Sequence, residues 1–73
     1  MLPGIAVMPT PEMIEREISD WLSPFDAETS RIRFAMVLHG ESPEDVAEVI
    51  GAREDKRAAI AAELRERAAN AYS

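Results

Sequence analysis

The sequence has 73 residues, with 8 lysine and arginine residues against 14 aspartate and glutamate residues, a net charge of −6 and a pI near 4.6. A chain of this length forms one domain at most, and because it has no cysteine, neither a disulfide nor a cysteine-ligated zinc can stabilise its core. The acidic balance argues against a free-standing nucleic-acid binder, and no apolar run approaches the roughly 20 residues that cross a bilayer.

The first nine residues are mostly apolar but are interrupted by Pro3, Gly4 and Pro9. We therefore expect an extended arm over residues 1–9 rather than a helix. The segment lacks the basic start of a secretory signal peptide, so we expect a cytoplasmic protein. Two roles are open for this arm: its apolar side chains fold back and close the core, or they bind a partner.

Residues 10–73 predict a single all-α domain, a compact bundle of about four short helices. Thr10 is a suitable N-cap and Pro11 suits the first helical position, so the first helix should run to about Leu22. Pro24 should then break the chain, because proline disfavours a helical conformation in the residue before it.

A second helix is expected over about residues 27–39, with Gly40 as its left-handed C-terminal stop. Its last part, Phe34-Ala35-Met36-Val37-Leu38, is apolar on nearly every side, which a helix tolerates when it is surrounded. We therefore expect this segment at the centre of the bundle, with five apolar residues packed round it: Trp21, Val46, Ile50, Ile60 and Leu64.

Two further helices should follow Gly40. Ser42 can cap a helix whose first residue is Pro43, and Gly51 should end this short helix. The last stretch, about residues 53–72, has no internal glycine or proline and should form the longest helix.

Residues 40–51, Gly-Glu-Ser-Pro-Glu-Asp-Val-Ala-Glu-Val-Ile-Gly, resemble the opening of helix-turn-helix units, including those of the promoter-reading region of sigma factors and of small terminase subunits. In those families a small residue is followed four positions later by a turn glycine, and Ala47 and Gly51 match that spacing. The resemblance covers about residues 38–67 and implies a helix-turn-helix-like hairpin. It also implies DNA binding by the helix from Arg53 to Arg67, for which the candidate residues are Arg53, Lys56 and Arg57.

The charge pattern favours a protein partner instead. Four carboxylates recur at helical spacing and form one acidic stripe, Glu41, Glu44, Asp45 and Glu48. They lie where helix-turn-helix families approach phosphate, which they would repel, and they would attract a partner with a basic surface. We therefore expect a small acidic interaction module that acts as a regulator, inhibitor or assembly subunit. Its composition is similar to that of many small phage-encoded proteins.

Self-association is a further prediction, because small side chains let helices approach closely; the candidates are Ala58, Ala61, Ala62 and Ala69. Catalysis is not expected. The only histidine, His39, and nearby Glu41 are too few ligands for a metal, and the chain lacks a glycine-rich phosphate loop. We expect a non-enzyme without cofactors or metals.

Overall fold

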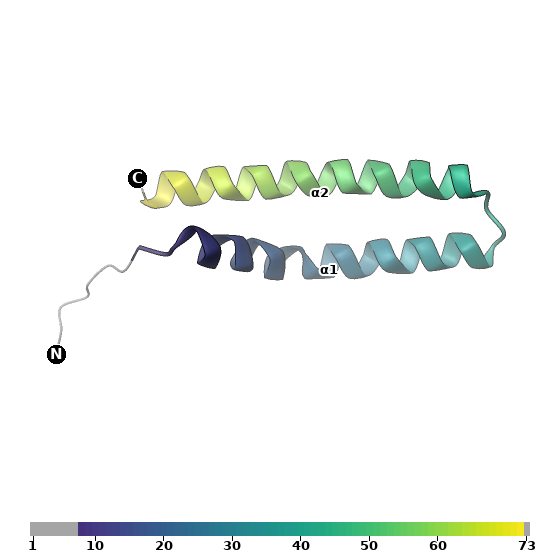
Figure 1. Ribbon diagram of the computed structural model, residues 1–73, viewed down its shortest axis with the longest axis horizontal. Helices are drawn as coiled ribbons and strands as arrows, with labels where there is room; N and C mark the ends of the chain where they lie inside the picture. Colours follow the sequence, from purple (N-terminus) through teal and green to yellow (C-terminus); the bar gives the residue numbers. More distant parts are fainter. Residues whose placement is uncertain (1–7, 73) are drawn as a thin grey trace.

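A computed structural model describes residues 8–72, which form two long antiparallel helices joined by a tight turn (Figure 1). Helix α1 spans Pro11–Leu38 and helix α2 spans Pro43–Tyr72. The all-α prediction is confirmed, but the prediction of a bundle of about four short helices is wrong. The chain is a hairpin with one contact surface between two helices.

The helix ends next to the turn and at the start of α1 are the ones predicted from local chemistry. Thr10 accepts a hydrogen bond from the Met13 amide (3.2 Å), and Ser42 accepts one from the Asp45 amide (3.1 Å). At the end of α1, Gly40 has a φ of 77°. The amides of Gly40 and Glu41 there donate to the carbonyls of Val37 and Met36, the pattern of a Schellman stop.

Pro24 does not break the chain as predicted, since it lies inside α1. Proline leaves the carbonyl four residues earlier without its usual donor. However, α1 presents Ile18, Leu22, Phe25 and Thr29 towards α2, at spacings that continue across Pro24. Packing on both sides of the proline therefore holds the helix together, which no signal within residues 23–26 reveals.

Gly51 does not end a helix either, because α2 continues through it without a left-handed residue. The predicted short helix and the predicted long helix are thus one element, and the turn expected at Gly51 is absent. Because α2 continues through Gly51, Ile50 and Arg53 on either side of this glycine lie against α1. Both contacts depend on α1 lying alongside.

The core is small, and its main cluster lies in the half of the hairpin nearer the chain ends. Within residues 8–72, the buried apolar residues are Ile18, Leu22, Ile50 and Ala61, and Ile60 and Leu64 pack against the cluster of Ile18, Leu22 and Ala61. The predicted central segment is not buried: Phe34, Val37 and Leu38 are 66%, 59% and 69% exposed. Trp21, expected in the core, is 71% exposed. Two helices bury only one side of each other, so the remaining apolar side chains face outward.

Most of the arm predicted over residues 1–9 lies outside the described residues; of it only Met8 and Pro9 belong to the described part, and they precede α1. Within residues 8–72, neither helix is long and apolar enough to span a membrane.

Candidate protein-interaction surface

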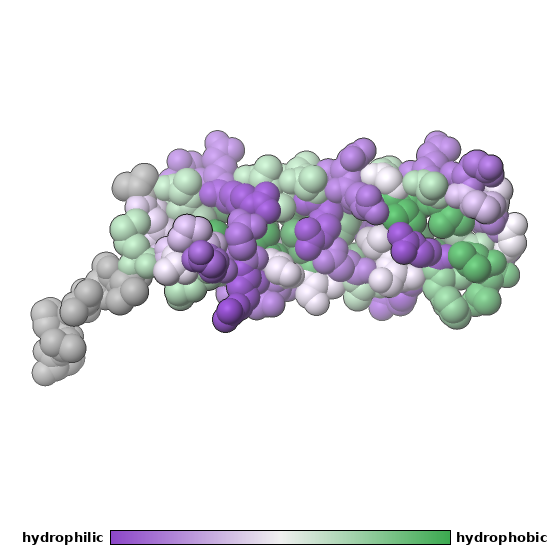
Figure 2. Space-filling model, in the orientation of Figure 1, coloured by the Kyte–Doolittle hydropathy of each residue, from purple (hydrophilic) through white to green (hydrophobic). Residues whose placement is uncertain are grey.

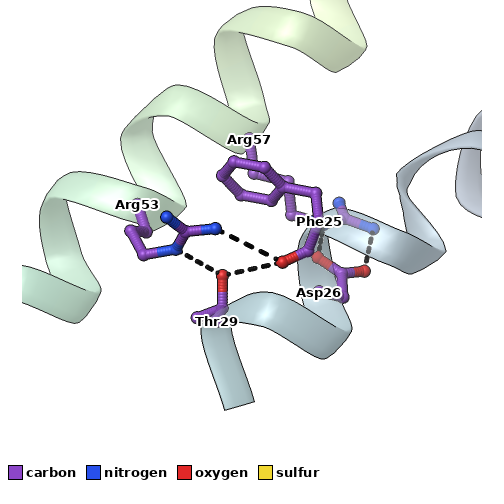
Figure 3. A network of polar contacts seen from close by, with 5 residues as sticks. All are labelled: Phe25, Asp26, Thr29, Arg53 and Arg57. Atoms are coloured by element: carbon purple, nitrogen blue, oxygen red, sulfur yellow. Dashed lines mark hydrogen bonds and ion pairs between the residues drawn. The ribbon is translucent and has the colours of Figure 1, made fainter. Parts of the chain in front are cut away.

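Arg53 and Arg57 hold α2 against the middle of α1 (Figure 3). The Arg53 Nε donates to Thr29 Oγ1 at 2.7 Å, its Nη2 donates to Glu28 Oε1 at 2.8 Å, and its guanidinium lies 4.3 Å from the centre of the Phe25 ring. Arg57 binds both carboxylate oxygens of Asp26, at 2.8 and 3.1 Å. These two arginines thus have a structural role between the helices.

A third arginine repeats this arrangement near the ends of the chain. Arg65 binds both carboxylate oxygens of Glu15, at 2.7 and 2.8 Å. Planar arginine–carboxylate pairs with two parallel hydrogen bonds have a defined geometry. The three arginines therefore fix the register between the helices, with Glu15 level with Arg65, Asp26 with Arg57 and Glu28 with Arg53.

The ion pairs make the hairpin sensitive to acid. Hydrogen bonds from Arg65 and Arg57 lower the pKa values of Glu15 and Asp26 below their ordinary values of 4.5 and 3.8; partial desolvation opposes this effect and the arginine charges add to it. A carboxylate whose pKa is lowered by folding stabilises the folded state fully above its ordinary pKa. That contribution is lost as the pH falls through the lowered value.

We therefore expect the melting temperature, followed by far-UV circular dichroism, to fall as the pH is lowered below 4.5 and then 3.8. A double variant, Glu15→Gln with Asp26→Asn, should melt lower at neutral pH and lose less on acidification, because its amides do not titrate. Equal acid sensitivity in both proteins would show that other carboxylates are responsible.

The acidic stripe lies at the turn end of the molecule. Its members, Glu41, Glu44, Asp45 and Glu48, are all exposed. Glu41 belongs to the turn, and Glu44 and Asp45 lie in the first turn of α2, where negative charge also favours the helix dipole. Within residues 8–72, none of the four forms an ion pair. Their charge is therefore available to a partner.

A groove of about 650 Å³ lies next to this stripe, and we call it the turn-end groove. Figure 2 shows apolar side chains gathered at this end of the hairpin, whereas charged side chains dominate much of the rest of the same face. Exposed Phe34 and Leu38 extend the apolar surface on the outside of α1. The groove is lined by Arg33, Val37, Glu41, Pro43, Val46, Ala47, Ile50, Gly51 and Glu54.

The sequence did not predict this groove, because it placed Phe34 to Leu38 inside a bundle. The signal that could have revealed it is the uninterrupted spacing of Ile18, Leu22, Phe25 and Thr29 across Pro24. One long α1 leaves only one long partner helix in a chain of this length. The apolar residues outside their shared contact are then necessarily exposed.

The four alanines predicted for self-association do not form one surface. Ala61 is buried against α1, in the same core cluster as Ile18 and Leu22. Ala58, Ala62 and Ala69 are exposed and follow the side of α2 that carries Arg65. Three of the four thus remain accessible.

The three residues proposed for DNA binding also differ in whether they contact α1. Arg53 and Arg57 are engaged by α1, whereas Lys56 is exposed and forms no ion pair within residues 8–72. In this part of the chain, no group of three or more histidine, cysteine, aspartate or glutamate side chains could hold a metal ion. His39 caps the end of α1 through its backbone amide, which donates to Ala35.

No family model, no curated protein and no solved structure matches this chain.

Proposed function

We propose that this chain is a cytoplasmic, non-catalytic interaction module that binds a protein partner through its turn end, as a regulator, inhibitor or assembly subunit. The observation that supports this most directly is the turn-end groove, an apolar recess bordered by carboxylates that form no ion pair with any residue from 8 to 72. Apolar surface of this kind on a small chain is typical of an interaction site.

The lining of the groove suggests the chemistry of the partner. Its apolar side chains are flanked by Glu41 and Glu54, against one cation, Arg33, and the rest of the acidic stripe lies beside it. From Pro43 to Glu54 the groove follows α2 for about 17 Å, or three helical turns. A short amphipathic helix with an apolar side and lysine or arginine flanks fits this length and charge.

DNA binding, the alternative function, has less support. Two of its three candidate residues, Arg53 and Arg57, already bind carboxylates of α1, and a DNA backbone would have to replace those contacts. A DNA-binding chain should be retained on duplex DNA at about 50 mM salt and released at higher salt. We expect no retention.

Site-specific photo-crosslinking in an extract of the native cells tests the protein-binding proposal. A benzophenone side chain at Ala47, inside the groove, should give an adduct that survives nuclease treatment and maps to a lysine- or arginine-rich helix of the partner. The matched control carries the probe at Ala59, an exposed residue of α2 outside the groove, and should give no such adduct.

Charge reversal supplies the second control. In the Ala47 probe protein, Glu44→Lys with Glu48→Lys should abolish the adduct while the circular dichroism spectrum stays helical, because both residues are exposed. The proposal is contradicted if Ala47 and Ala59 react alike, if nuclease removes the adduct, or if the adduct maps to an acidic segment.

A further inference from the structure

A second exposed surface surrounds Trp21, the only tryptophan of the chain, towards the terminal end of the hairpin. Trp21 is 71% exposed and forms one wall of a groove of about 320 Å³, which also includes Met13, Leu64 and Tyr72. A large aromatic side chain left exposed on a helix beside an apolar groove is a typical contact residue. The two helices of this chain leave the surface uncovered.

The α1 side of this surface is acidic. Residues three, four and seven positions apart share one side of a helix. Glu17, Trp21 and Glu28 have this spacing, and Ile14 precedes them on the same line. Asp26, two residues before Glu28, consequently lies on the opposite flank of α1.

The α2 side of the same surface carries three cations, Arg53, Lys56 and Arg67, and one acid, Glu63, which accepts a hydrogen bond from Arg67 at 2.8 Å. Arg53 reaches Glu28, so this part of α2 borders the Trp21 flank of α1. Lys56 and Ile60 follow Arg53 by three and seven positions, and Val49 and Arg67 extend their line in both directions. We call the whole surface the Trp21 face; it consists of Ile14, Glu17, Trp21 and Glu28 on α1, and Val49, Lys56, Ile60, Glu63 and Arg67 on α2.

The register of the hairpin makes the Trp21 face self-complementary. The arginine pairs place Trp21 level with the helical turn that holds Ile60. They also place Glu17 close to the level of Arg67, and Glu28 close to the level of Lys56. The two members of each pair differ in level by no more than three residues, or about 4.5 Å along the helix axis. Glu28 on α1 thus matches Lys56 on α2 in height, and Glu17 matches Arg67, which also pairs with Glu63 of its own chain.

We propose that the Trp21 face binds a second copy of this chain, forming a symmetric dimer with four helices. The twofold axis runs parallel to the helices, so α1 of each copy lies against α2 of the other and every residue keeps its level. This arrangement brings Glu17 and Glu28 of one copy to Arg67 and Lys56 of the other. It also places Trp21 over Ile60, and all four neighbouring helix pairs are antiparallel.

The size of this surface is adequate for a dimer. It extends over about 20 residues of two helices, roughly 30 Å by 20 Å, or about 600 Å² on each copy. Stable interfaces bury about 800 Å² on each partner, so we expect a dissociation constant in the micromolar range. The turn-end groove lies on the Asp26 side of the hairpin and stays open in this dimer, which is therefore independent of the proposed function.

Sedimentation velocity of the full chain tests the proposal, together with the emission of Trp21. Between about 1 μM and 1 mM protein, the mass should rise from the 8.1 kDa of one chain to twice that value. The tryptophan emission should shift to shorter wavelength over the same range, because Trp21 leaves water. A monomer throughout this range overturns the proposal.

Variants locate the interface. Trp21→Ala should weaken the dimer at least about 30-fold, as expected for a central aromatic contact, whereas Phe34→Ala removes an exposed aromatic outside the face and should change nothing. Lys56→Glu should weaken the dimer about 10-fold by facing Glu28 of the second copy, with helicity unchanged because Lys56 forms no ion pair within its own described chain.

Ala62→Gln distinguishes the alternative surface, because it adds bulk to the exposed alanines of α2. We expect it to leave the dimer intact. A dimer that resists Trp21→Ala and Lys56→Glu, or that Ala62→Gln alone dissociates, would assign self-association to the alanines and overturn the proposal.

Discussion

Replacing Leu22 with alanine is expected to unfold most of the protein at room temperature. Leu22 is 2% exposed and is the largest fully buried side chain within residues 8–72. Removing a buried leucine side chain costs about 3 kcal/mol, and a single small core rarely supplies more than about 3–5 kcal/mol in total. Far-UV circular dichroism should therefore show the loss of most helical signal, together with a urea midpoint close to zero.

Leu38 provides the matched control for this experiment. It belongs to the same helix but is 69% exposed, so Leu38→Ala removes the same atoms without opening a cavity. The urea midpoint of Leu38→Ala should stay close to that of the unmodified chain. If both variants lost equal stability, the apolar residues near the turn would have to be buried in solution, and the exposed turn end described above would be wrong.

Replacing Pro24 with alanine is expected to have the second largest effect, in the opposite direction. Pro24 lies in the interior of α1, where proline is about 3 kcal/mol less favourable than alanine. Alanine restores the hydrogen bond to the carbonyl of Asp20, while the greater freedom of the unfolded chain offsets part of this gain. We expect the free energy of unfolding, from urea titration, to rise by about 2 kcal/mol.

Pro43 tests the same argument at a helix start. It occupies the first position of α2, where the backbone N–H of any residue has no intrahelical acceptor, so a proline there removes no hydrogen bond. Its ring also holds φ at the helical value. Pro43→Ala should therefore leave stability unchanged or lower it slightly. If Pro24→Ala also failed to raise stability, α1 would not be a continuous helix through residue 24, and the break predicted from the sequence would be correct.

Features decided by neighbouring residues could be predicted from the sequence. The caps at Thr10 and Ser42 join residues three apart, and the stop at Gly40 depends on one left-handed residue and the last turn before it. The acidic stripe follows in the same way, since its residues are close together in the sequence. The protein partner proposed for this stripe is not a local feature of the chain, because it depends on a second molecule.

Features decided by distant residues could not be predicted in this way. Arg65 and Glu15 are 50 positions apart, and Arg53 and Glu28 are 25 apart, so no local pattern pairs them. The basic character of Arg53 and Arg57 suggested a nucleic-acid contact, whereas in the hairpin these two side chains hold α2 against α1. The turn-end groove likewise exists only because α2 lies against α1.

The sequence by itself determined that this protein is helical, where three of its helix ends lie, and that it is acidic at the turn. Only the tertiary structure decided that Pro24 and Gly51 lie inside helices, because the packing of Leu22 and Ile50 across the hairpin outweighs the local preference of those two residues. The same packing decided which apolar side chains are left outside. Two helices can bury one side of each other, so Trp21, Phe34 and Leu38 remain exposed and become candidates for contacts with other molecules.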